Sequence, residues 1–181
     1  LVVTPAATRL ADETHLRRNA EGYQVVITDV TAGEGVLAIM GPNARDLLAK
    51  VSPNDFSNDT NPFGPAQEIE LGMGLARAHR VSYVGELGWE LYVPSDMAGH
   101  AFETLWEAGQ DVGLQLCGMH MMDSCRIEKA FRHFGHDITC EDNVVDAGLS
   151  FAVDMSKPDF IGKGAVADRK DSGPHARMVQ F

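Results

Sequence analysis

Hydrophobic and polar residues alternate most regularly within residues 80–94. In the run WELYV at 89–93, apolar residues recur at every second position, which places Glu90 and Tyr92 together on the opposite face of a β-strand. A β-rich run also precedes the segment GELG at 85–88, so the pattern predicts a β-hairpin. A carboxylate in the middle of such a strand is costly to bury without hydrogen-bond donors. We therefore expect the face that carries Glu90 to be solvated or covered by a ligand.

The other elements follow from the same kind of pattern. Two β-rich runs separated by TAGE predict a second hairpin, and a glycine-interrupted run predicts a weaker strand. Apolar residues at helical spacing, with proline, serine or glycine at the ends of several runs, predict helices. The expected strands are 1–4, 23–30, 35–40 and 67–76. The expected helices are 8–19, 42–51, 95–113 and 120–131. A loop is expected at 52–65 and a polar linker at 168–174.

This order of elements predicts an α+β fold in which helices pack on antiparallel sheets, rather than a parallel βαβ array. In the helix at 95–113, Phe102 and Leu105 are expected to pack against a sheet. A length of 181 residues suits one domain with a substantial core. The chain begins without Met and stops in a strand-like run, so we expect a fragment of a longer polypeptide.

Charge and cysteine content narrow the classes of function. The formal net charge is -11 and the sequence pI is near 4.9, so nucleic acids and anionic membrane surfaces would repel the chain. No apolar run approaches the roughly 18 to 20 residues of a membrane-spanning helix. Three cysteines without a CxxC pair favour a reducing compartment, which is the cytoplasm or, in a eukaryote, the mitochondrial matrix.

Several candidate sites fail on spacing. The glycines of GELG and GMG lack the spacing of nucleotide-binding loops. His133, His136 and Cys140 have metal-binding side chains, but Gly135 interrupts the helix between the histidines and no fourth ligand follows, so no metal is expected. Cys125 has no base near it in the sequence, and we interpret it as a small buried thiol.

Glu90 is the strongest candidate for ligand binding. A fixed carboxylate accepts two parallel N–H bonds from an amidine-like edge, such as that of a pterin or a guanine, and charge-assisted pairs of this kind are strong. Tyr83 and Tyr92 would add a stacking wall and a hydroxyl. The alternative is an ion pair between Glu90 and a lysine or arginine on a neighbouring strand, and the spacing alone does not decide between the two.

Four ordered motifs resemble one protein family. They are GPNARDLL at 41–48, SYVGELGWELYVP at 82–94, DSCRIEKAFRHFGHDIT at 123–139 and DAGLSFAVDMSKPDFIGKGAV at 146–166. The chain resembles the folate-binding aminomethyltransferases, the glycine cleavage T protein family, and is most similar to the C-terminal folate domain of dimethylglycine/sarcosine dehydrogenases. The resemblance covers most of the chain.

The resemblance implies a tetrahydrofolate-dependent one-carbon-transfer domain. In the family a flavin (FAD) domain of the same parent chain oxidises a small N-methyl amine, and N5 of tetrahydrofolate captures the carbon as 5,10-methylenetetrahydrofolate. The second glutamate of the family's GExGxE motif holds the pterin and corresponds to Glu90, while the neighbouring aromatic positions correspond to Tyr83 and Tyr92. The family's catalytic aspartate lies upstream of Leu1, so we assign no catalytic residue and expect the isolated fragment to be inactive.

Met122 stands where glycine-cleavage members carry an arginine, which fits the dehydrogenase branch and removes one expected folate contact. The family fold places ferredoxin-like subdomains before a C-terminal β-barrel. Residues 1–170 are therefore expected to form the folate-binding domain, and 171–181 a linker and the first strand of the barrel. Two alternatives remain open, namely a folate-dependent S- or O-demethylase or aminomethyltransferase, and a non-catalytic folate-binding scaffold.

Overall fold

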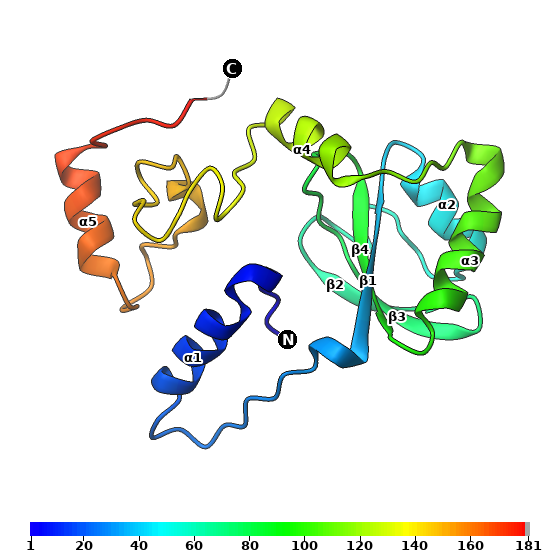
Figure 1. Cartoon of the computed structure of the whole chain (residues 1–181), viewed down its shortest axis with the longest axis horizontal. Coiled ribbons are helices and arrows are strands. Elements are labelled where there is room, and N and C mark those ends of the chain that lie inside the picture. Colours follow the sequence, from blue (N-terminus) through cyan, green and yellow to red (C-terminus); the bar gives the residue numbers. More distant parts are fainter. Residues whose placement is uncertain (180–181) are drawn as a thin grey trace. The chain divides into compact units, whose positions relative to one another are not determined.

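In the computed structural model, an antiparallel sheet organises the first part of the chain (Figure 1). Its strands are β1 (Glu34–Met40), β2 (Ala66–Leu71), β3 (Gly74–His79) and β4 (Gly88–Pro94). The order in the sheet is β1-β4-β3-β2, and each neighbouring pair is antiparallel. As an inner strand, β4 therefore has hydrogen-bonded neighbours on both sides.

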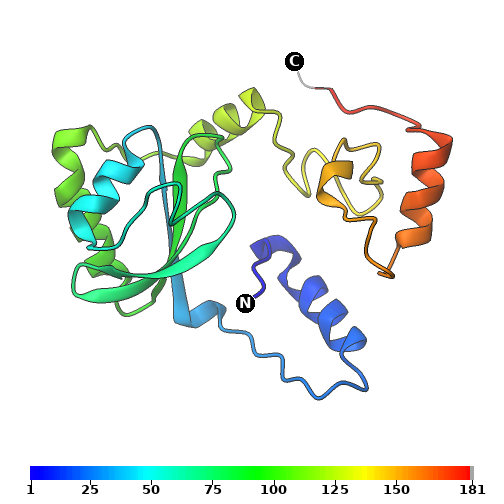
Figure 2. The same ribbon diagram turned by 180° about the vertical axis from the view of Figure 1, so that it is seen from behind.

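One face of this sheet forms the hydrophobic core. Trp89, Leu91 and Val93 of β4 lie on it and are 0%, 0% and 1% exposed, as the alternation predicted. The helices α2 (Ala44–Val51) and α3 (Ala98–Gly109) pack against this face and against each other, and Figure 2 shows them side by side from behind. Because burying each large apolar side chain contributes about 1.5–3 kcal/mol, this layer is the main source of stability around β4.

The predicted hairpin at 80–94 is wrong in its first half. Residues 80–87 form a loop, and the partners of β4 are β1 and β3. The register sets Glu90 opposite Ala38 on one side and His79 on the other. Alternation along a strand indicates which face each residue occupies, but the choice of neighbouring strand depends on packing between distant segments.

The second predicted hairpin is also wrong, because residues 23–30 form no strand, and neither do residues 1–4. The hairpin that does form joins β2 and β3, and it overlaps the run at 67–76 that was predicted as one weak strand and extends beyond its end. Gly72 sits at its turn with a φ of 58°, a left-handed conformation that glycine adopts without a steric cost.

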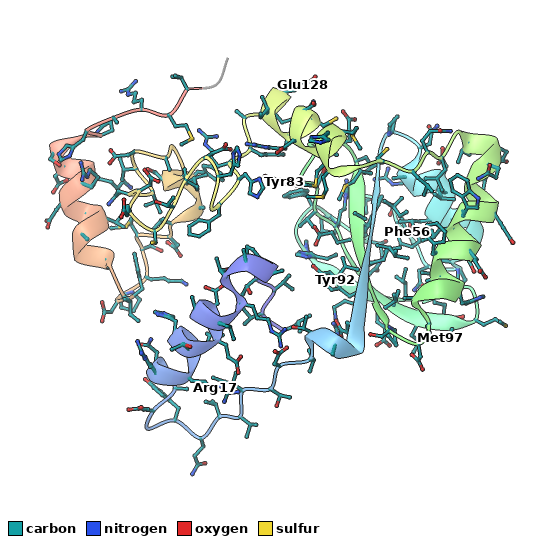
Figure 3. All side chains as sticks on the ribbon, in the orientation of Figure 1. Arg17, Phe56, Tyr83, Tyr92, Met97 and Glu128 are labelled. Atoms are coloured by element: carbon teal, nitrogen blue, oxygen red, sulfur yellow. The ribbon has the colours of Figure 1, made fainter. Side chains whose placement is uncertain are left out.

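Residues 52–65 form the predicted loop, without helix or strand. Phe56 fixes this loop to the core, where it is 3% exposed. Its ring meets Trp89 edge to face, with ring centroids 5.6 Å apart at 82°. Figure 3 labels Phe56 and Tyr92, which lie on opposite sides of the sheet.

The structure describes residues 1–179, which divide into two compact units, Leu1–Arg126 and a second that begins at Ile127. Three further helices are present, of which two were predicted from the sequence and the last was not. These helices are α1 (Arg9–Asn19), α4 (Met119–Glu128) and α5 (Lys163–Ser172), and short 3-10 turns lie at Ala6–Thr8, Thr31–Gly33, Gln110–Val112 and Ser150–Ala152.

The polar linker predicted at 168–174 is mostly wrong, because α5 occupies it as far as Ser172. The sequence of α5, KGAVADRKDS, has few apolar residues, so the periodicity that marks a packed helix is weak there. Residues 173–179 form no strand, and 180–181 lie outside the described residues. The domain assignments 1–170 and 171–181, with a barrel strand at the end, remain predictions.

The predicted α+β class, with helices on an antiparallel sheet, is confirmed. Within residues 1–179, none of the helices combines the length and the apolar character needed to cross a membrane.

Candidate functional site

Glu90 lies at the centre of β4, on the face of the sheet opposite the core. Its register neighbour Ala38 on β1 is a small, exposed residue, so no long side chain stands beside the carboxylate on that side. Glu90 itself is half-buried. The strand thus presents a carboxylate on a rigid part of the fold with free space next to it.

The carboxylate of Glu90 accepts a hydrogen bond from Tyr92, two residues along the same strand. The phenolic oxygen of Tyr92 lies 2.6 Å from Oε2 of Glu90. Tyr92 is only 7% exposed, and burial, followed by its hydrogen bond to the Glu90 carboxylate, raises the pKa of its hydroxyl. The hydroxyl therefore remains protonated and continues to donate throughout the physiological pH range.

A cavity of about 770 Å³ opens beside Glu90, within the unit Leu1–Arg126. This volume falls in the range of about 300–1,000 Å³ that is usual for pockets holding small molecules and cofactors. Its walls come from β1, the loop before β4, α3, and the segment that leads into α4. They are predominantly apolar or aromatic, and include Leu37, Ala38, Met40, Tyr83, Val84, Phe102, Trp106, Leu114, Leu116, Met119 and Met122.

Among the described residues that line this cavity, Glu90 is the sole acidic residue, and neither lysine nor arginine occurs. The basic residues nearest in the sheet have other partners: Arg77 of β3 pairs with Glu34 at 3.6 Å, and Nε2 of His79 lies 2.6 Å from the carbonyl oxygen of Gly64. Within residues 1–179, Glu90 therefore forms no ion pair. The alternative interpretation, an ion pair between Glu90 and a lysine or arginine on a neighbouring strand, does not match the structure.

The model of the GCVT N-terminal domain family matches residues 1–157. The chain belongs to this family. Of its curated relatives, 4-methylaminobutanoate oxidase (formaldehyde-forming) from Paenarthrobacter nicotinovorans is 44% identical over 180 residues, which are 99% of this chain and 22% of the oxidase. The mitochondrial dimethylglycine dehydrogenase of Homo sapiens is 36% identical over 182 residues, which are 99% of this chain and 21% of the dehydrogenase. The chain spans about a fifth of each relative.

A solved structure agrees with this assignment. The glycine cleavage system aminomethyltransferase T from Bartonella henselae matches with a TM-score of 0.75 and 28% identity, over 93% of this chain and 45% of the transferase. The resemblance found in the four motifs is thereby confirmed, and this GCVT-family chain is an aminomethyltransferase-like domain related to dimethylglycine dehydrogenase.

Two of the three site residues predicted from the sequence line the cavity of this GCVT-family chain. Glu90 and Tyr83 both line it, whereas Tyr92 reaches it only through its contact with Glu90. Figure 3 labels Tyr83 and Tyr92. Met122, at the position expected to carry an arginine in glycine-cleavage members, also lines the cavity and adds apolar surface there. Their roles in binding folate remain predictions.

Sequence reasoning missed much of the cavity wall. Phe102 was expected to pack against a sheet together with Leu105, but it is 41% exposed and stacks on Trp106 of the same helix, with ring centroids 6.5 Å apart and planes 2° apart. Leu105, in contrast, is buried as predicted at 3% exposure. Both aromatic rings line the cavity. The spacing of four residues between them was a usable signal, since residues at i and i+4 share a helix face.

The remaining candidate residues lie outside the cavity lining in the described part of the chain. The rings of His133 and His136 stack with centroids 5.6 Å apart. Cys125 is half-buried rather than buried, and its Sγ lies 3.4 Å from Sδ of Met121 in the preceding turn. Within residues 1–179, no group of three or more histidine, cysteine, aspartate or glutamate side chains is arranged to hold a metal ion.

Proposed function

We propose that this chain is the tetrahydrofolate-binding, one-carbon-transfer part of a dimethylglycine/sarcosine dehydrogenase-like enzyme. The observation that carries the proposal is the position of Glu90, which among the described residues is the single acidic group lining an otherwise mainly apolar cavity. A pterin is a flat, apolar ring system whose amidine-like edge has two adjacent N–H donors. A lone carboxylate on a rigid strand matches that edge, because it can accept both N–H bonds in parallel.

The rest of the cavity suits the remainder of the cofactor. Tyr83 and Val84 line the same cavity as the carboxylate, and Phe102 and Trp106 add aromatic surface for a benzoyl ring. Bound tetrahydrofolate would supply the N5 amine that takes up a carbon unit at the oxidation level of formaldehyde and gives 5,10-methylenetetrahydrofolate. The residues of this chain bind and orient the cofactor and exclude water, while the catalytic aspartate is expected upstream of Leu1.

The substrate class follows from the relatives. The names of the oxidase and the dehydrogenase each contain an N-methylated amino acid, which supports a small methylated amine as the carbon source. We propose that an FAD-containing domain of the same parent chain carries out its oxidation, in the cytoplasm or, in a eukaryotic source, in the mitochondrial matrix.

Replacing Glu90 with glutamine tests the proposal. Glu90→Gln keeps the shape of the side chain but removes the charge and one acceptor, and a hydrogen bond to a charged group contributes roughly 1.5–3 kcal/mol. Tetrahydrofolate affinity, measured by calorimetric titration of the protein at its native length, should fall about 10- to 150-fold.

Glu86→Gln is the matched control. Glu86 lies four residues away in the same motif, is exposed, and does not line the cavity within the described residues, so this variant makes the same charge change without touching the site. Its affinity should equal that of the wild type. Equal affinities for all three proteins would overturn the assignment of Glu90 and the proposed binding site with it.

A further inference from the structure

The geometry around Glu90 assigns a role to Tyr92 that differs from direct contact with the ligand. In the part of the chain that the structure describes, the cavity is lined by Glu90 and Tyr83 but not by Tyr92. The ring of Tyr92 is 7% exposed. A phenol has a single O–H donor, and that donor already points to Oε2 of Glu90 at 2.6 Å.

Tyr92 is itself held firmly. It belongs to the inner strand of the sheet, opposite Val36 of β1 and Arg77 of β3. Arg77 pairs with Glu34, so the neighbouring positive charge is occupied. The hydroxyl of Tyr92 is thus a fixed point from which the longer, more flexible side chain of Glu90 can be oriented.

Other neighbours do not orient Glu90. Ala38 is too short to reach it, and the ring of His79 is engaged with the carbonyl of Gly64. Within residues 1–179, Tyr92 is the one side chain that forms a hydrogen bond with the carboxylate of Glu90. Because an ionised carboxylate has about four lone-pair sites, a single bond from Tyr92 leaves acceptor sites for two N–H groups of a ligand.

We propose that Tyr92 is a positioning residue, whose hydroxyl fixes the plane of the Glu90 carboxylate so that it meets both N–H donors of a pterin edge at once. This inference rests on the proposed function and refines it. Without the hydroxyl, the carboxylate rotates freely, and ordering it when the ligand binds costs conformational entropy. A freely rotating carboxylate still accepts one N–H bond, but it loses the preference for a ligand with two.

The test compares two ligands and four proteins at native length. Affinities for tetrahydrofolate and for its analogue without the 2-amino group are measured for wild type, Tyr92→Phe, Glu90→Gln and the double variant. Tyr92→Phe keeps the buried ring, and should weaken tetrahydrofolate binding about tenfold, the lower end of what a hydrogen bond to a charged group contributes. It should also shrink the preference for tetrahydrofolate over the analogue.

In the Glu90→Gln background, the further change Tyr92→Phe should have little effect, because Tyr92 acts through the carboxylate. p-Aminophenylalanine at position 92 restores an N–H donor and should recover both affinity and preference, and it serves as the second variant if Tyr92→Phe does not fold. Tyr23→Phe, at an exposed tyrosine outside the cavity, is the control and should match the wild type.

The outcomes separate the two claims. If Glu90→Gln weakens binding while Tyr92→Phe changes neither affinity nor preference, the positioning role is overturned and the proposed function stands. An equal loss from Tyr92→Phe in both backgrounds also overturns it, since that result means direct contact with the ligand. If Glu90→Gln leaves the affinity unchanged, the proposed function itself fails, whatever Tyr92 does.

Discussion

The indole Nε1 of Trp89 donates a hydrogen bond of 2.6 Å to Oδ1 of Asn61, and both residues are almost fully buried. The backbone oxygen of Asn61 accepts a second hydrogen bond, from the guanidinium of Arg80, whose Cζ lies 5.6 Å from the centre of the Trp89 ring. Asn61 therefore ties the loop at 52–65 to the strand that carries Glu90. Trp89 is the residue next to Glu90 along β4, so this link adjoins the candidate site.

Asn61→Ala should destabilise the protein by about 1–3 kcal/mol, because it leaves the buried N–H of Trp89 without an acceptor. Denaturant unfolding followed by tryptophan fluorescence measures the change. Asn19→Ala, at an exposed asparagine that ends α1, should stay within about 0.5 kcal/mol of the wild type. Comparable stabilities for the two variants would contradict the role given to Asn61.

The face that carries the candidate site could be predicted from the sequence. Strict alternation in β4 requires Glu90 and Tyr92 to share one face and Trp89 and Leu91 the other, and the hydrogen bond between Tyr92 and Glu90 agrees with this, although Tyr92 is buried like the core-facing residues. This prediction succeeds because the period of a strand is a local property of the backbone. The same period makes a contact between Tyr92 and Glu90 possible, and in the structure the hydroxyl of Tyr92 donates to Oε2 of Glu90 at 2.6 Å.

The partners of β4 and the walls of the cavity could not be predicted in the same way. Glycines at both ends of GELG favoured a local hairpin, yet the neighbours of β4 come from β1 and β3. β1 lies more than 40 residues before β4 in the sequence, and β3 is separated from β4 by the loop at 80–87, so neither pairing is set by a tight local turn. The cavity likewise combines Tyr83, Phe102 and Met122 from three separate segments, and no local pattern in the sequence links them.

Two glycines of α3 should respond in opposite directions to alanine. A Cβ at Gly109 would lie 2.6 Å from Cβ of Leu114, which lines the cavity, whereas a Cβ at Gly99 meets nothing within 4 Å. Gly109→Ala should therefore destabilise by about 1–3 kcal/mol through overpacking. Gly99→Ala should stabilise by about 0.5–1 kcal/mol, since alanine loses less backbone entropy in a helix.

Thermal unfolding of the two alanine variants measures this contrast. Gly109→Ala should in addition weaken tetrahydrofolate binding, because the displaced Leu114 belongs to the cavity wall. Gly99→Ala should leave binding unchanged. A neutral or stabilising Gly109→Ala would show that the segment after α3 adapts without cost, and would contradict the tight packing seen here.

The contact between α1 and the segment before β1 should weaken in acid. Asp29 accepts hydrogen bonds from Thr31 and from the guanidinium of Arg9, with Nε of Arg9 at 2.7 Å, and these partners lower the pKa of Asp29 from 3.8 to about 2. A carboxyl whose pKa is lower in the folded state stabilises that state above its unfolded pKa. The contribution is therefore complete above pH 3.8 and is lost as the pH falls toward 2.

Wild type and Asp29→Asn should differ in unfolding free energy at pH 5, and the difference should shrink steadily between pH 3.8 and 2. Asp59→Asn, at an exposed aspartate of the loop at 52–65, is the control, and its curve should run parallel to that of the wild type. A difference between wild type and Asp29→Asn that stays constant down to pH 2 would contradict the contact, because a carboxylate held by Arg9 and Thr31 must lose both partners when it is protonated.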